Sequence, residues 1–269
     1  MSVKLIAIDI DGTLLNSKSE LTDMVRSEVI SASKKGVKIV LSSGRPFKGL
    51  KWLLEKLDLI KEDEYTIARN GPQVVRNIDE HRIYKKFIKA SDAIRANEYA
   101  KDKGSSFFYF SDEEVITCEK EDEYVNIETT LNKLDAKVIS FSSLQGDEEV
   151  CKMTFTSSSN LLNSIQKEVE EEFENDFTVV RSHKNFIELL NKESSKGEAI
   201  KFLCSHLGIS IEETMGIGDN DNDYSLLKEC KYKIVMANSK SEKLRSIATD
   251  IAPSNDEDGV AKIIQKYIN

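Results

Sequence analysis

The sequence has few of the residues that build disulfide frameworks, histidine metal sites or flexible linkers. Its 269 residues include four cysteines, three histidines and three prolines. The cysteines are far apart, with no Cys-x-x-Cys pair, which favours reduced core thiols in a cytoplasmic protein over a disulfide or zinc framework. The scattered histidines give little support to a histidine metal site or a Ser/His/Asp triad. No Pro-rich or Gly/Ser-rich segment indicates a linker.

Long apolar runs and excess positive charge are also missing. No stretch approaches the roughly 18 apolar residues of a membrane span, and Asp9 interrupts the first apolar run too early for a signal peptide. We therefore expect no membrane partner. The net charge of −9 argues against a nucleic-acid partner, which would normally meet a basic surface. It also means that local positive groups or a metal must attract any anionic substrate. The sequence does not indicate an oligomeric state.

The composition is typical of an ordinary globular protein, with 39% hydrophobic and 32% charged residues. Helix-length segments at Thr22–Lys35 and Phe47–Leu59 separate apolar runs that are typical of buried strands. That alternation predicts an α/β fold, a Rossmann-like parallel sheet with crossover helices. Thr22 suits a helix N-cap, and Gly36 suits the residue that ends the helix. The predicted strands are Val3–Ile8, Val37–Leu41, Tyr65–Ala68, Thr214–Ile217 and Lys233–Met236.

The middle of the chain has a different pattern, which indicates an inserted α+β unit. Aromatic and β-branched runs alternate there with amphipathic segments, and in one of these an apolar stripe recurs at spacings of three and four residues. We expect a first core part at 1–82, the insert at 83–186 and a second core part at 187–269. The predicted strands of the insert are Phe107–Phe110, Val138–Phe141, Met153–Thr156 and Thr178–Val180, and its helical stripe is Leu162, Ile165, Val169 and Phe173.

Asp9 and Asp11 follow the first predicted strand, where alternation would point both carboxylates the same way, and Gly12 allows a tight turn after them. Catalytic groups of such sheets gather beyond the carboxyl ends of the strands. An ionised carboxylate can attack phosphorus without a base, and a second carboxylate can donate a proton to the leaving oxygen and later take one from water. The alternative at this point is an acidic turn that caps a helix.

A second acidic cluster, Gly216–Asp223, lies at the end of the fourth predicted strand. Its oxygen ligands suit a hard cation such as Mg²⁺. An Asp-x-Asp-x-Asp run also opens a calcium-binding EF-hand loop, which needs Gly at position six and Glu at position twelve. Those positions hold Tyr224 and Cys230, and the run at Asp9 has Leu14 at its sixth position. The calcium loop is therefore excluded at both places.

Two weaker signals complete the set. Ser42-Ser43-Gly44-Arg45 ends the second predicted strand, where a hydroxyl and a backbone amide can hold a phosphate oxygen, although many such sequences are only loops. Lys196 opens a predicted helix. It could neutralise a phosphate and hold the nucleophilic carboxylate, but a lysine near a helix start is more often solvated.

Taken in order, these four pieces resemble the motifs of the haloacid dehalogenase (HAD) superfamily of phosphatases. The likeness extends to Asn70-Gly71, to Val235–Asn238 and to the run Asp256–Val260, which look like the Cof-type subfamily. That subfamily carries a large α/β cap between the second and third motifs, and the gap from Arg45 to Lys196 has the required size. The chain departs from the pattern by Ser43 in place of threonine, by Pro72, and by Ala237 and Ser239 beside Asn238.

The resemblance implies a role for each matched residue. Asp9 would be the nucleophile and a metal ligand, and Asp11 the general acid and base, with its backbone carbonyl on the metal. The implied cofactor is Mg²⁺, with Asp219 as its remaining protein ligand. Asp223 would support the metal or Lys196 indirectly. The phosphoryl group would be held by Ser43, the amides of Gly44 and Ile10, Lys196 and Asn222.

The sequence thus predicts a Mg²⁺-dependent phosphomonoesterase that acts on small phosphorylated metabolites through an aspartyl phosphate. Sugar phosphates are the commonest expectation for the subfamily. One alternative is a phosphomutase or phosphotransferase, which passes the phosphoryl group to a second substrate. Another is a non-catalytic metabolite-binding protein, although such a protein has no need of a second aspartate.

Overall fold

The computed structural model describes residues 3–111, 114–119, 122–132, 134–146 and 148–268, and it divides into two compact units. The first, or core unit, comprises Met1–Lys85 and Ser195–Asn269. The second, or inserted unit, comprises Lys86–Ser194. Each is a layered α/β structure with its own hydrophobic core. The predicted fold class, a parallel-sheet core with an inserted α+β domain, is confirmed. No helix among the described residues has the length and apolarity to cross a membrane.

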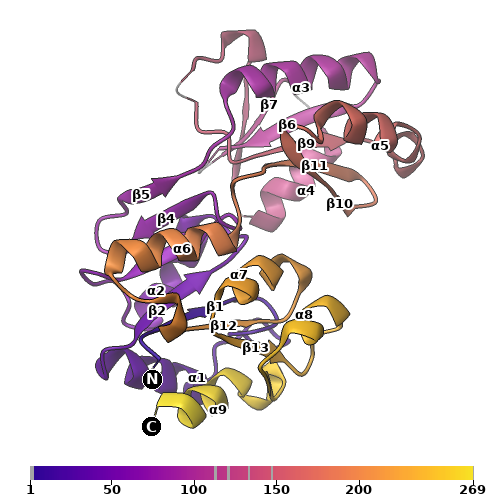
Figure 1. The fold of residues 1–269 in the computed structure, drawn as a ribbon. Helices are drawn as coiled ribbons and strands as arrows, with labels where there is room; N and C mark the ends of the chain where they lie inside the picture. Colours follow the sequence, from indigo (N-terminus) through magenta and orange to yellow (C-terminus); the bar gives the residue numbers. More distant parts are fainter. Residues whose placement is uncertain (1–2, 112–113, 120–121, 133, 147, 269) are drawn as a thin grey trace. The chain divides into compact units, whose positions relative to one another are not determined.

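The core unit is built on an eight-stranded sheet (Figure 1). Neighbouring strands are parallel from β14 to β3, and β4 and β5 extend the sheet antiparallel. The strands, in spatial order, are β14 (Asp250–Ala252), β13 (Tyr232–Met236), β12 (Thr214–Gly218), β1 (Leu5–Ile8), β2 (Lys38–Ser42), β3 (Tyr65–Ala68), β4 (Gln73–Arg76) and β5 (Arg82–Lys85). The hairpin strands β4 and β5 were not among the predicted strands.

Helices cover both faces of this sheet, which is why its central strands are apolar throughout. In β1, Ile6 and Ile8 pack into one hydrophobic cluster, whereas Leu5 and Ala7 pack into the other. The first cluster includes helices α1 (Asp23–Lys34), α2 (Lys51–Lys56) and α9 (Gly259–Ile268). The second includes α6 (Lys196–Leu207), α7 (Tyr224–Glu229) and α8 (Glu242–Ile247). A strand buried on both faces has no need of polar alternation.

Local signals explain the bounds of α1. Thr22 caps the helix by accepting a hydrogen bond from the amide of Val25 over 3.3 Å. The helix ends at Lys34, and Gly36 follows with a φ of +88°, a conformation that glycine adopts without strain. A short 3-10 helix at Phe47–Leu50 and then α2 occupy the second predicted helical segment.

The inserted unit has a six-stranded sheet in the order β10-β11-β9-β6-β7-β8. Its pairs are antiparallel except for β7 with β8. The predicted stripe of α5 is buried at all four of its residues. The elements are α3 (Ala90–Asp102), β6 (Ser106–Phe110), β7 (Glu114–Thr117), α4 (Glu123–Asn132), β8 (Asp135–Val138), β9 (Lys152–Thr156), α5 (Ser159–Phe173), β10 (Phe177–His183) and β11 (Phe186–Asn191).

Two details of this unit differ from the sequence expectations. The predicted strand Val138–Phe141 ends at Val138, because Phe141 starts a 3-10 turn and packs against Phe107 with ring centroids 5.5 Å apart. The expected insert of 83–186 would end inside the sheet. Strand β11 pairs with both β9 and β10, so it belongs to the inserted unit, which continues to Ser194.

Candidate active site

The carboxylate of Asp9 lies at the carboxyl end of the central strand β1. Its amide donates to the carbonyl of Ile217 over 3.0 Å, which continues the pairing of β1 with β12 by one residue. The residue is only 5% exposed. Ile10, which follows, is fully buried, and its carbonyl accepts hydrogen bonds from the amides of Thr13 and Leu15. The tight turn after the strand therefore anchors Asp9 in a fixed direction.

Lys196 lies between two buried carboxylates. Its Nζ is 2.6 Å from Asp9 Oδ1 and 2.6 Å from Asp223 Oδ1. The lysine opens α6 after the N-cap Ser195, and its side chain is fully buried. Burial lowers the pKa of Lys196, but the charges of Asp9 and Asp223 more than offset this and raise it. The lysine of this motif is thus a buried cation, and the solvated alternative is wrong.

The same cluster carries an excess of negative charge. Burial raises the pKa of Asp9, and Asp223 and Asp219 act in the same direction, whereas Lys196 lowers it. Burial, with help from Asp223, also raises the pKa of Asp219 to about 6. One lysine cannot balance three neighbouring carboxylates in a site of low polarity. A further cation at this place would relieve the repulsion.

The oxygens of this cluster suit a hard divalent cation. Asp9, Asp219 and Asp223 each offer a carboxylate oxygen within 4.8 Å of the others. Asp223 is already engaged, because its Oδ1 accepts from Lys196 and its Oδ2 from the amides of Asp219 and Asn220 over 3.1 and 3.2 Å. Asp9 and Asp219 are therefore the carboxylates best placed to hold a metal, and an all-oxygen set is the kind that Mg²⁺ prefers.

Gly12 packs directly against Asp219. A Cβ atom at Gly12 would lie 2.4 Å from Asp219 Oδ2, and the residue has a φ of +82°. Glycine is required on both counts, since a side chain would collide with the carboxylate and strain the backbone. The hydroxyl of Thr13 donates to the other oxygen of Asp219 over 3.2 Å. The turn after Asp9 thus contacts both oxygens of Asp219.

Asp11 lies at the solvent-exposed side of the site. Its side chain is 55% exposed, and Arg45 donates to both of its oxygens, from Nε over 3.0 Å and from a terminal nitrogen over 2.6 Å. Arg45 had no role in the sequence prediction, although it belongs to the quoted Ser-Gly-Arg motif. Its guanidinium group is well shaped to hold a carboxylate or a phosphate through two parallel hydrogen bonds.

Ser43 follows β2 at the same edge of the sheet. It is 2% exposed, and its hydroxyl oxygen accepts from the amide of Arg45 over 3.1 Å, which leaves the hydroxyl proton for another acceptor. Its carbonyl accepts from the amide of Asn70 over 2.8 Å. Gly44 packs on the same asparagine, since a Cβ there would lie 3.0 Å from Asn70 Nδ2. The backbone thus holds the Ser43 loop in place.

Asn222 is exposed, and among the described residues its side chain makes no hydrogen bond to the buried cluster. Its amide donates instead to Asn70 Oδ1 over 3.3 Å. Asn70 therefore joins the loop after β12 to the loop after β2. Asn238, beside the departures at Ala237 and Ser239, donates to the carbonyl of Gly12 over 2.8 Å.

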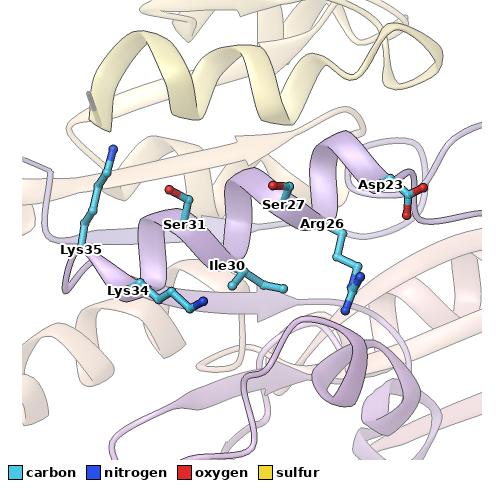
Figure 2. Close-up of a pocket in the computed structure, with 7 residues that line it drawn as sticks. All are labelled: Asp23, Arg26, Ser27, Ile30, Ser31, Lys34 and Lys35. Carbon is cyan, nitrogen blue, oxygen red and sulfur yellow. The ribbon is translucent and has the colours of Figure 1, made fainter.

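A hollow of about 620 Å³ lies elsewhere, along the exposed side of α1 (Figure 2). None of the candidate residues lines it. Figure 2 shows Ser27 and Ser31 on one side of the helix, and Ile30 and Lys34 on the other. Its lining residues are Asp23, Arg26, Ser27, Ile30, Ser31, Lys34 and Lys35.

Comparison with known proteins agrees with this geometry. Residues 6–264 match the family of haloacid dehalogenase-like hydrolases. A relative from Streptococcus pyogenes serotype M6, provisionally named a phosphatase, is 32% identical over 269 residues that cover 100% of this chain and 99% of the relative. A relative from Bacillus subtilis is named 5-amino-6-(5-phospho-D-ribitylamino)uracil phosphatase. It is 27% identical over an alignment that covers 100% of this chain and 97% of the relative.

The fold agrees as well. The crystal structure of a haloacid dehalogenase-like hydrolase from Bacteroides thetaiotaomicron superimposes with a TM-score of 0.87 at 28% identity, over 98% of this chain and 99% of that one. The match runs through both units of the chain, so the resemblance of the separate motifs extends to the whole fold. This chain belongs to the haloacid dehalogenase-like hydrolase family, and it is an enzyme of that family's phosphatase type.

Proposed function

We propose that the chain is a Mg²⁺-dependent phosphomonoesterase that hydrolyses small phosphorylated metabolites through an aspartyl-phosphate intermediate. The observation that carries the proposal is the buried set of Asp9, Lys196 and Asp223 beside Asp219. A carboxylate that lies against a buried lysine is oriented and is not free to turn into solvent. It can serve as the nucleophile.

In the first half of the reaction, Asp9 attacks phosphorus and the bond to the ester oxygen breaks. Asp11, on the exposed side, donates a proton to that oxygen, so the leaving group departs as an alcohol. The product is an acyl phosphate on Asp9. Lys196, with the Ser43 hydroxyl and the amides of Gly44 and Ile10, would neutralise and hold the phosphoryl oxygens, and Asn222 would reach them from the loop after β12.

In the second half, Asp11 accepts a proton from a water molecule while that water attacks phosphorus. The bond between phosphorus and Asp9 breaks, which regenerates the carboxylate and releases inorganic phosphate. When bound, Mg²⁺ would supply positive charge between an anionic nucleophile and an anionic phosphate. Asp9 and Asp219 would hold it with the backbone carbonyl of Asp11, and Asp223 would keep Lys196 charged and in place.

Small sugar or polyol phosphates are the proposed substrate class. The name of the B. subtilis relative supports this, because it describes action on a phosphorylated ribityl compound. The net charge of −9 speaks against a nucleic-acid substrate. We propose that the inserted unit is the cap that selects the leaving group, and that the protein works in the cytoplasm.

The first test is phosphate release from a panel of phosphorylated metabolites with Mg²⁺ present. We expect turnover of one or more sugar or polyol phosphates by the native protein, and at least a ~10³-fold loss in Asp9→Asn, because the nucleophile is gone. Asp221→Asn is the matched control, since it removes an exposed carboxylate close in sequence to Asp219. Near-native turnover by Asp9→Asn would refute the mechanism.

Metal removal gives the second test. EDTA is expected to abolish phosphate release, and excess Mg²⁺ to restore it. If the enzyme keeps full activity after dialysis against EDTA, the metal part of the proposal is wrong. Phosphoryl transfer to an added sugar, with little free phosphate, would instead identify a phosphotransferase.

A further inference from the structure

Asn238 forms a link between the C-terminal part of the core unit and the turn after Asp9. It lies in the loop after β13, and its side-chain amide donates to the carbonyl of Gly12 over 2.8 Å. The oxygen of the same side chain accepts from the backbone amide of Asn255 over 3.1 Å. Both ends of the side chain are thus engaged, which fixes its position.

Asn255 extends this link to a second point on the same turn. Its side chain is buried and donates to the carbonyl of Leu15 over 2.9 Å. Together, Asn238 and Asn255 hold the turn at Gly12 and at Leu15, on either side of Thr13. We call these two residues the asparagine clamp.

On its other side, the held turn contacts the carboxylate of Asp219. Gly12 approaches Asp219 Oδ2 so closely that a Cβ would lie 2.4 Å from it, and Thr13 donates to Asp219 Oδ1 over 3.2 Å. A shift of the Gly12–Thr13 peptide must therefore move the carboxylate of Asp219. The separation of Asp219 from Asp9 depends on where the clamp holds the turn.

From this chain of contacts we infer that Asn238 is a positioning residue for the metal site and that it tunes the site to a small cation. The inference rests on the proposed function, since it assigns Asp9 and Asp219 as the ligands. Mg²⁺ demands short, near-octahedral coordination, whereas Ca²⁺ accepts longer and more flexible arrangements. Loosening the turn must therefore weaken Mg²⁺ binding more than Ca²⁺ binding.

The experiment is calorimetric titration of the intact protein with Mg²⁺ and, separately, with Ca²⁺. Asn238→Ala removes both hydrogen bonds, and Asn238→Asp keeps the acceptor for Asn255 but sets an oxygen against the Gly12 carbonyl. We expect each to weaken Mg²⁺ binding about tenfold, the lower end of the effect of supporting contacts at metal sites, and Ca²⁺ binding less than about threefold.

Asn77→Ala is the matched control. Asn77 is a buried asparagine that likewise donates to a backbone carbonyl, that of Leu59 over 2.9 Å, and accepts from Thr66 over 2.8 Å. Asn77 lies at the end of the sheet opposite the candidate active site, next to the start of β3. Its loss should lower the thermal unfolding temperature, as the Asn238 variants do, and leave both metal affinities unchanged.

Three results would overturn the inference, and they are distinguishable. If the native protein binds neither cation, the metal part of the proposed function fails and the clamp has no site to tune. If the native protein binds Mg²⁺ and the Asn238 variants bind it within twofold, only the clamp fails. If Asn77→Ala weakens Mg²⁺ binding as much as Asn238→Ala does, the weaker binding reflects a general loss of stability and not the position of the turn. Since Asn238→Asp keeps the shape of the side chain, it also decides the matter where the alanine variant does not fold.

Discussion

Arg45 donates two hydrogen bonds, of 3.0 and 2.6 Å, to the carboxylate of Asp11, which lies 34 residues earlier in the sequence. Both side chains are partly exposed, so the ion pair by itself adds little to stability. Its effect is on direction. A carboxylate that would otherwise turn freely in solvent is held with both oxygens fixed, close to the buried Asp9.

We therefore expect Arg45→Ala to lower kcat about tenfold, because Asp11 loses its fixed orientation for proton transfer. The kcat of Arg45→Lys should lie between those of the native and Arg45→Ala enzymes, since an ammonium group cannot form two parallel hydrogen bonds to the carboxylate. Steady-state kinetics measures both. Arg76→Ala is the control, because Arg76 grips Asp79 in the same two-pronged way at the opposite edge of the sheet. An unchanged kcat in Arg45→Ala would remove Arg45 from the mechanism.

Alanine substitution at two glycines can distinguish backbone strain from damage to the candidate active site. Gly12 and Gly36 both have positive φ, of +82° and +88°, but a Cβ at Gly36 would meet no atom within 4 Å. We expect Gly36→Ala to cost about 1 kcal/mol of unfolding free energy with activity unchanged. Gly12→Ala should cost a similar strain and also abolish phosphatase activity, because its methyl group displaces Asp219. Urea unfolding and phosphate release measure the two effects. An active Gly12→Ala enzyme would contradict the assignment of Asp219.

Removal of the Lys196 charge should destabilise the fold. Lys196→Met leaves Asp9 and Asp223 facing each other without their common cation, at an expected loss of about 3–5 kcal/mol in unfolding free energy. Adding Asp223→Asn to this variant should recover part of the stability and none of the activity, which a double-mutant cycle in urea would show. Additive losses in the cycle would mean that the two residues are not coupled.

The burial of Glu64 leads us to expect that the stability of the protein depends on pH, for a reason separate from catalysis. It precedes β3, its Oε1 lies 3.8 Å from Lys38 Nζ, and its Oε2 has no hydrogen-bond partner in the described part of the chain. Burial raises the pKa of Glu64 to about 7, against an ordinary value of 4.5, and Lys38 offsets this only in part. Between these values the native state binds more protons than the unfolded state, so unfolding free energy falls as the pH rises.

Glu64→Gln removes that titration. We expect the variant to be about 2 kcal/mol more stable than the native protein at pH 8, with little difference at pH 4. Urea unfolding at both pH values is the measurement, and Glu62→Gln, at an exposed position two residues earlier, is the control. If the unfolding free energies of the native and Glu64→Gln proteins changed with pH in the same way, a buried Glu64 with a raised pKa would be excluded.

Much of the core could be predicted from the sequence because its strands are buried on both faces. Short runs such as Leu5–Ile8, apolar throughout, are typical of the strands of a parallel sheet, and the residues that follow them reach the same edge of that sheet. Asp9 and Asp219 could be expected at that edge, and the structure adds that the strands before them are neighbours. The hairpin of β4 and β5 was missed because charged residues border both strands and β5 is only half-buried.

The contacts between side chains could not be predicted in the same way. Nothing in the order of residues tells that Arg45 turns to Asp11. For Asp223, the resemblance left open whether it supports the metal or Lys196, and only the structure shows its contact with Lys196. The end of the insert was misplaced for a related reason. Strand β11 resembles a core strand in its apolar character, and only its pairing with β9 and β10 assigns it to the inserted unit.

The position of β1 between β2 and β12 has a consequence for biosynthesis. β1 is made before β12, one of its two neighbours, which begins only at Thr214. The inserted unit, Lys86–Ser194, is complete as a stretch of chain before that neighbour has been made. A nascent chain therefore holds an unpaired edge of β1 until β12 has been made, a kind of edge that invites aggregation. The central sheet, and with it the catalytic edge, can close only after the whole inserted unit has been synthesised.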